Sequence, residues 1–187
     1  MEGYTLKVGS RSILVEPTPL LATKANYRTH SLHWASDQHL VLSPSLVNRG
    51  LALAFILVGA LLLLTAITIP FAGQEALGKA VIAACGSPIF LTIGMLSWPR
   101  RFAFDAATGQ LRTSKLWWKW QRPLRDVLAV QLIEDPGTRP IGTTYQLNLV
   151  LDDERRPRVN LSNYTDQQAT REVGREVARH LSIPLLE

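Results

Sequence analysis

The sequence has only one cysteine in 187 residues, Cys85, and it has no block of five or six like charges. A disulfide within one chain and a zinc site built from several cysteines are therefore excluded. The net charge of +5 comes from 20 Lys and Arg against 15 Asp and Glu spread along the chain. Nucleic-acid binding normally needs a denser basic cluster, so nucleic acid is not an expected partner.

Recognisable catalytic arrangements are also missing from the sequence, because no nucleophile–base set, Gly-rich phosphate loop or familiar pair of carboxylates occurs. His30 and His33 lie three residues apart, and in a strand this odd spacing puts them on opposite faces. The acidic triplet Asp152–Glu154 is followed at once by Arg155 and Arg156, which favours a solvated turn over a cation site. We therefore expect no enzyme, no cofactor and no metal.

Two long stretches, in contrast, are apolar and uncharged: Leu51–Ala72 and Ala80–Trp98, separated by the polar residues 73–79. At 1.5 Å rise per residue they form helices of about 33 and 28 Å, close to the ~30 Å hydrocarbon core of a bilayer. A helix satisfies its own backbone hydrogen bonds in lipid. The sequence therefore predicts a transmembrane helical hairpin within residues 49–99, retained as an anchor because it begins about fifty residues into the chain.

The charges that flank the two stretches predict the orientation. Arg49 precedes the first stretch, and Arg100 and Arg101 follow the second, whereas the connecting loop holds Lys79 balanced by Glu75. Cytoplasmic segments carry an excess of Lys and Arg. We expect a multi-pass protein of the inner (cytoplasmic) membrane with both termini in the cytoplasm.

Small residues in the second stretch are expected to pack against another helix. Ala83 and Ser87 have the four-residue spacing that lets helices approach closely, and Pro88 lies beside them in mid-helix. The partner is either the first stretch or a helix of another membrane protein, and both interpretations stay open. Neither stretch holds Lys, Arg, His, Asp or Glu, which argues against a transporter or proton relay.

Residues 100–187 change to a pattern of alternating apolar and polar residues broken by turns, which predicts an antiparallel α+β domain. Five strands are expected, at residues 101–105, 111–118, 127–134, 144–151 and 158–161. A final amphipathic helix begins after an N-cap at Thr165 or Asp166 and ends near Ser182.

The residues before the first apolar stretch contain one more pair of strands. Thr29–Trp34 and His39–Pro44 flank a short turn, which predicts a β-hairpin within residues 28–48 after an N-terminal leader, residues 1–27. We expect this hairpin to join the strands that follow the membrane helices, giving one sheet or split barrel of about seven strands. The alternative is that the first fifty residues are a flexible leader.

This order of elements resembles two groups of proteins. Phe102–Asp105, a Gly turn, the strand Tyr145–Leu151 and a closing amphipathic helix resemble bacterial two-span membrane proteins with a pleckstrin-homology-like (PH-like) domain. Two adjacent spans, the start at Arg101–Asp105 and the ending Leu181–Leu185 are similar, more weakly, to the photosystem I assembly protein family of chloroplasts and cyanobacteria. That second resemblance implies a two-span architecture and a non-catalytic helper.

The segment from Trp117 to Arg122 is the most unusual part of the soluble region. Its aromatic and basic residues are the candidate contacts with a partner or with lipid: Trp117, Trp118, Lys119, Trp120, Arg122 and Arg125. The indoles either pack within the sheet or against a partner protein, or they lie in the headgroup region while the basic residues meet anionic lipid.

These observations favour an integral-membrane scaffold or accessory (assembly) subunit, which docks a membrane protein complex through its transmembrane hairpin and its PH-like domain. The alternative function is a membrane-surface sensor that lies on the lipid bilayer and binds anionic lipid headgroups.

Overall fold

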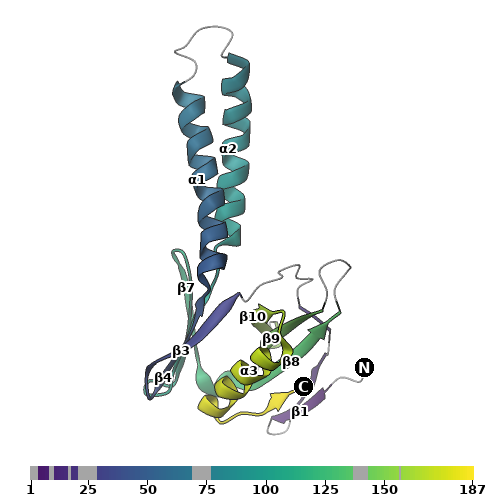
Figure 1. Ribbon diagram of the computed structural model, residues 1–187. Coiled ribbons are helices and arrows are strands. Elements are labelled where there is room, and N and C mark those ends of the chain that lie inside the picture. Colours follow the sequence, from purple (N-terminus) through teal and green to yellow (C-terminus); the bar gives the residue numbers. More distant parts are fainter. Residues whose placement is uncertain are drawn as a thin grey trace. The chain divides into compact units, whose positions relative to one another are not determined.

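The computed structural model describes residues 4–8, 11–16, 18–20, 29–68, 77–136, 143–155 and 157–187. Contacts divide the chain into two compact units. The sheet unit consists of Met1–Ser43, Arg101–Ser114 and Lys119–Glu187, and the helical unit consists of Pro44–Arg100 and Lys115–Trp118. Figure 1 labels both long helices and most, but not all, of the strands.

The helical unit holds two long helices, α1 (Leu46–Thr68) and α2 (Leu77–Ser97), which lie side by side (Figure 1). Both are long and apolar enough to span a membrane. Helix α1 begins five residues before the apolar stretch, because the Ser45 hydroxyl accepts a hydrogen bond from the Asn48 backbone N–H at 3.2 Å and caps the first turn. The last four residues of the first predicted apolar stretch, 69–72, lie outside the described residues.

Small residues let α1 and α2 approach closely. A Cβ atom added at Gly59 would lie 2.8 Å from the backbone nitrogen of Leu91, closer than van der Waals contact allows. The Ser87 hydroxyl donates a hydrogen bond to the Gly59 carbonyl at 2.9 Å. Ala83 is buried as well, whereas Pro88 is exposed on the outer surface of the hairpin. Ala83 and Ser87 are therefore used for packing within the chain.

The first sheet of the sheet unit combines strands from before and after the two helices. Its order is β3-β4-β5-β6-β7. The strands are β3 (His30–Ser36), β4 (His39–Pro44), β5 (Arg101–Asp105), β6 (Gln110–Lys115) and β7 (Trp118–Pro123). Strand β4 pairs antiparallel with β5, so that Leu40 lies opposite Phe104 and Leu42 opposite Phe102. The hairpin before α1 thus joins the strands after α2, as expected from the sequence.

The second sheet has the order β10-β9-β8-β11 and is covered by the C-terminal helix (Figure 1). Its strands are β8 (Val127–Asp135), β9 (Thr144–Leu151), β10 (Arg158–Tyr164) and β11 (Leu185–Leu186), of which β11 runs parallel to β8. Helix α3 (Gln167–Leu181) begins after Asp166, whose carboxylate accepts hydrogen bonds from two backbone N–H groups, and ends at Ser182. Of the two predicted N-cap residues the structure selects Asp166, and the predicted end near Ser182 is confirmed, because Ser182 caps the helix after its last residue, Leu181.

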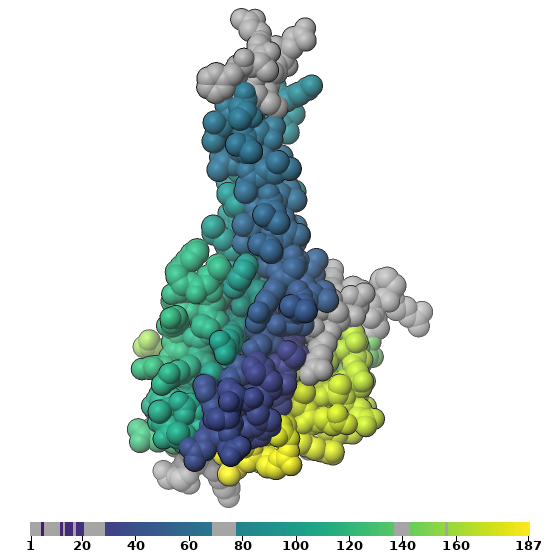
Figure 2. Space-filling model, turned by 60° about the vertical axis from the view of Figure 1, so that its left-hand side comes forward, coloured from purple at the N-terminus to yellow at the C-terminus, as the bar shows by residue number. Residues whose placement is uncertain are grey.

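Both sheets and α3 share one hydrophobic core. Phe102 and Phe104 of the first sheet, Leu149 of the second and Val177 of α3 all belong to it and are 1% exposed or less. At the rim, the Trp34 indole N–H donates a hydrogen bond to Glu176 of α3. Figure 2 shows the β3–β4 residues (dark blue) beside the C-terminal residues (yellow) at this rim.

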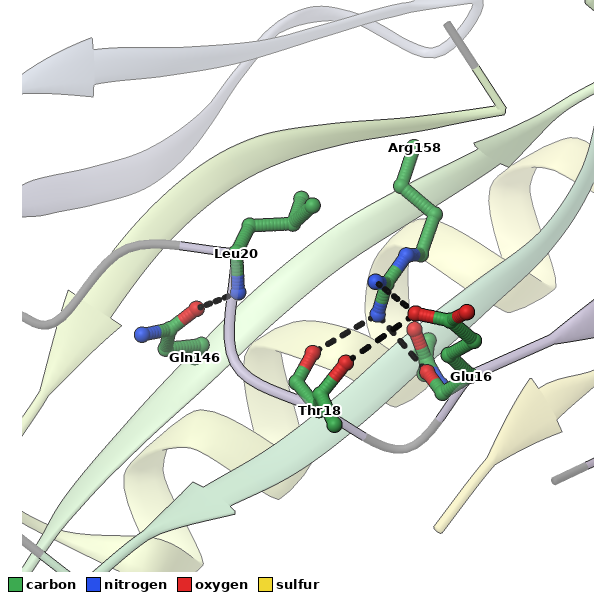
Figure 3. Close-up of polar contacts among 6 residues, drawn as sticks. Glu16, Thr18, Leu20, Gln146 and Arg158 are labelled. Atoms are coloured by element: carbon green, nitrogen blue, oxygen red, sulfur yellow. Dashed lines mark hydrogen bonds and ion pairs between the residues drawn. The ribbon is translucent and has the colours of Figure 1, made fainter.

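Part of the N-terminal segment that was expected to be a leader forms strands and hydrogen bonds where the structure describes it. Strands β1 (Tyr4–Val8) and β2 (Arg11–Val15) form an antiparallel hairpin. In the segment that follows, the carbonyls of Glu16 and Thr18 accept hydrogen bonds from the Arg158 guanidinium at 2.7 and 2.8 Å. The Leu20 N–H donates to the buried side-chain carbonyl of Gln146 at 3.1 Å (Figure 3). This segment therefore lies against the second sheet.

The expected strand-rich domain with a C-terminal helix is present, but the described strands do not form one single sheet, because they divide between two sheets and the separate β1–β2 hairpin. One cause of this difference is a turn that the pattern of apolar residues does not reveal. The chain reverses at Leu116, which has a φ of 50°, so the expected strand 111–118 ends at Lys115 and a new strand, β7, begins at Trp118. Strand β11 has only two residues, too few to show any periodicity.

Candidate functional site

The turn between β6 and β7 exposes two tryptophans. Trp117 has 75% and Trp118 has 51% of its surface exposed. Both belong to the helical unit, together with the two apolar helices, whereas the residues on either side of this turn belong to the sheet unit. We call residues Lys115–Trp118 the tryptophan turn.

Lys115 fastens the tryptophan turn to the end of α2. Its ammonium group donates a hydrogen bond to the carbonyl of Leu96 at 2.7 Å. The last carbonyls of a helix have no partner within the helix and carry partial negative charge, so a cation is favoured there. Burial lowers the pKa of Lys115, and the nearby charge of Arg100 lowers it further. The two exposed indoles are thus held next to the carboxyl end of α2.

The other residues of the predicted cluster have different environments. Trp120 packs against the core of the sheet unit, and the Arg122 guanidinium lies 5.8 Å from the centre of its ring. Arg122 also forms an ion pair with Asp153, in the turn after β9. This ion pair attaches β7 to the rest of the sheet unit. The side chain of Arg125, in contrast, is 87% exposed on a short 3₁₀ helix, Leu124–Asp126.

Lys119 lines a hollow of about 720 Å³ on the first sheet, which we call the basic hollow. Its lining comes from β4, β5, β6 and β7, and all of these lining residues belong to the sheet unit. The lining consists of His39, Arg101, Ala103, Arg112, Thr113, Ser114, Lys119, Trp120 and Gln121. A volume of this size lies within the range of small-molecule sites, about 300–1,000 Å³.

The alternation of the strands explains why positive charges gather on this face. Phe102 and Phe104 of β5 face the core, so their neighbour Arg101 faces outward. On β6 the buried Leu111 lies opposite Phe104, so Arg112, one residue further, also faces outward. The register thus puts guanidinium groups from adjacent strands on the same face of the sheet.

The charge of the basic hollow is little compensated within the described residues. Its lining contains no Asp or Glu, and the structure shows no ion pair of Arg101 or Lys119 with a described residue. Arg112 lies 3.9 Å from the carboxylate of Asp105, at the long limit of an ion pair. Hydrogen bonds from Thr108 lower the pKa of Asp105, and the charges of His39 and Arg112 add to that effect.

One lining residue of the basic hollow, His39, has a buried nitrogen atom without a hydrogen-bond partner among the described residues. His39 Nε2 is shielded from solvent and makes no hydrogen bond to a described residue. A buried polar atom of this kind normally has a hydrogen-bond partner in a folded protein.

Sequence reasoning singled out Lys119 but missed Arg101, Arg112 and His39 as members of one site. The β5–β6 alternation and the turn at Gly109 already put Arg101 and Arg112 on one face, a signal that was available in the sequence. The approach of His39 depends on the pairing of β4 with β5 across the inserted helices. That pairing joins residues sixty or more positions apart, so the local sequence pattern does not reveal which side chains meet.

The described residues hold no group of three or more His, Cys, Asp or Glu that could bind a metal ion. His30 is buried and His33 is exposed, as their odd spacing predicts. Neither protein-family models nor curated proteins provide a match to this chain. The resemblances to PH-like membrane proteins and to the photosystem I assembly family therefore stay predictions, and the function has to be argued from the site itself.

Proposed function

We propose that this chain is a non-catalytic, membrane-anchored module that holds its sheet unit at an anionic membrane surface. Helices α1 and α2 form the anchor. The charges at Arg49, Arg100 and Arg101 support an orientation with both termini in the cytoplasm, at the inner membrane. The sheet unit, whose two sheets and C-terminal helix are compatible with the PH-like plan expected from the sequence, then faces the cytoplasmic leaflet.

The observation that carries this proposal is the attachment of the tryptophan turn to α2. The hydrogen bond from Lys115 to Leu96 holds Trp117 and Trp118 beside the last turn of an apolar helix. Tryptophan is enriched at the level of the lipid headgroups, where its ring meets both apolar and polar surroundings. Two indoles that are half or more exposed at this level fit contact with the interface of the bilayer.

The scaffold or accessory-subunit function expected from the sequence is the second candidate, and the same exposure of Trp117 and Trp118 supports it. Tryptophan and arginine are frequent at the energetic centres of protein interfaces. The burial of Ala83 and Ser87 inside the hairpin, however, removes the small-residue contact with a partner helix on which that expectation partly rested. We therefore rank contact with lipid above docking to a partner protein as the role of the tryptophan turn.

The experiment uses the full chain in nanodiscs that contain lipids brominated near the headgroup, which quench nearby indoles. We expect the Trp117→Phe/Trp118→Phe variant to lose a large part of the quenching seen in the native chain. The control is Trp34→Phe, because Trp34 is about as exposed as Trp118 but lies on β3 of the sheet unit. The control variant should keep the quenching due to the tryptophan turn.

Equal quenching of the double variant and the native chain would contradict lipid contact by the tryptophan turn. A stoichiometric complex isolated from native membranes with mild detergent, and lost in the double variant, would then support the scaffold function.

A further inference from the structure

We propose that the basic hollow binds a phosphate monoester group through Arg101, Arg112 and Lys119. This inference deepens the proposed function and rests on it for the source of the phosphate, which is either a lipid headgroup or a small soluble molecule. Its chemistry comes from the hollow alone.

The geometry of the cations fits a compact, multiply charged anion. Arg101, Arg112 and Lys119 come from the adjacent strands β5, β6 and β7 and line the same hollow. Guanidinium groups bind pairs of phosphate oxygens through two parallel hydrogen bonds, and an ammonium group adds a third direction of approach. A phosphate monoester offers three terminal oxygens to such a set.

Neutral donors line the same hollow. Ser114 and Gln121, whose side chains carry a hydroxyl and an amide group, both line it. Both groups can donate a hydrogen bond to an anion. The hollow therefore combines charge with directional donors, which a patch of positive charge alone does not provide.

The chain connects the basic hollow to the membrane anchor at two points. Arg101 directly follows Arg100, and Lys119 directly follows Trp118, and both preceding residues belong to the helical unit. One residue step spans about 3.8 Å between Cα atoms. Two of the three cations are thus covalently next to segments that the proposed function places at the bilayer surface, which favours a lipid headgroup as the source of the phosphate.

The test uses the full chain in nanodiscs of phosphatidylcholine, titrated by calorimetry with glycerol 3-phosphate and, separately, with inorganic phosphate. We expect saturable binding of one glycerol 3-phosphate per chain. Arg112→Gln and Lys119→Gln should each weaken it about tenfold or more, since each removes a charge-assisted hydrogen bond to the anion. Arg125→Gln is the matched control, because Arg125 lies outside the hollow, and it should bind as the native chain does.

The source of the phosphate is found by adding phosphatidic acid, whose headgroup is a phosphate monoester, to the nanodiscs. Competition with glycerol 3-phosphate in the native chain supports the site and identifies a lipid as its ligand. Unchanged binding of glycerol 3-phosphate supports the site and identifies a soluble ligand.

Three results would overturn the inference: no saturable binding, equal loss in Arg125→Gln and Arg112→Gln, or tighter binding of a short single-stranded DNA than of glycerol 3-phosphate. The Arg112→Gln chain must keep the native thermal midpoint, and Lys119→Gln provides an independent second variant. The result of the brominated-lipid experiment is interpreted separately from the phosphate titrations. Quenching that depends on Trp117 and Trp118 without phosphate binding would leave the proposed function standing and reject only this site.

Discussion

Gly59→Ala should weaken the packing of α1 against α2, because there is no room for a side chain at this position. The added Cβ would lie 2.7 Å from the Leu91 side chain and 2.8 Å from its backbone nitrogen. A flexible side chain can turn away, but a backbone atom cannot. Since ordinary contact begins at 3.4 Å, the two helices have to separate by about 0.6 Å at this point.

The cost can be worked out from three contributions. Overpacking of a tight contact costs about 1–3 kcal/mol. The same separation stretches the hydrogen bond from Ser87 to the Gly59 carbonyl, now 2.9 Å, to the limit of a hydrogen bond, and such bonds within membranes contribute about 0.6 kcal/mol. Alanine offsets about 1 kcal/mol through its higher helix propensity. We expect a net destabilisation of the hairpin by about 0.6–2.6 kcal/mol.

The assay follows opening of the hairpin in the full chain during titration with sodium dodecyl sulfate. Energy transfer between dyes at the exposed Cys85 and at Leu61→Cys, also exposed, reports the separation of the helices. Gly50→Ala is the matched control, because nothing lies within 4 Å of a Cβ atom at Gly50. A Gly59→Ala hairpin as stable as the Gly50→Ala hairpin would refute the reasoning.

Two further predictions concern the sheet unit. Ser182→Gly should raise the thermal midpoint by roughly 2–4 °C, because Ser182 has a φ of 54°, a conformation that costs about 1 kcal/mol more for serine than for glycine; an unchanged or lower midpoint would contradict this. Asp105→Asn removes a carboxyl group whose pKa is lowered in the fold mainly by hydrogen bonds from Thr108. Because its pKa is lower in the folded chain, ionised Asp105 stabilises the fold at pH values above the unfolded pKa of 3.8, and this stabilisation is lost as the pH falls through the lower, folded pKa. The native chain should therefore be more stable than Asp105→Asn at pH 7 and lose this advantage in acid. A constant difference in thermal midpoint between pH 7 and pH 3 would count against that assignment.

The parts of the fold that follow from local chemistry could be predicted from the sequence. The N-cap at Asp166 and the helix end at Ser182 are local signals, and both are confirmed. The two apolar helices follow from length and absence of charge. The start of α1 at Leu46 was missed, although Ser45 after Pro44 is a capping signal that apolarity alone does not include.

The parts that depend on long-range contacts could not be predicted in the same way. The placement of Glu16, Thr18 and Leu20 needs Arg158 and Gln146, which are more than 120 positions away. Strand β11 exists because Leu185 pairs with Val130 of β8, not because of any repeat in its own sequence. For the site, aromatic and basic composition pointed to Trp117 and its neighbours, but which cations share a hollow depends on strand register.

The central claim is that α1 and α2 cross a membrane and leave the sheet unit on its cytoplasmic side, and single-cysteine labelling tests it most directly. In a Cys85→Ala background, Ala107→Cys lies in the exposed turn between β5 and β6, and Gly78→Cys lies in the exposed first turn of α2. A membrane-impermeant maleimide should label Gly78→Cys in intact cells and Ala107→Cys only in inverted vesicles. Labelling of Ala107→Cys in intact cells, or release of the chain from membranes by alkaline carbonate, would contradict the account.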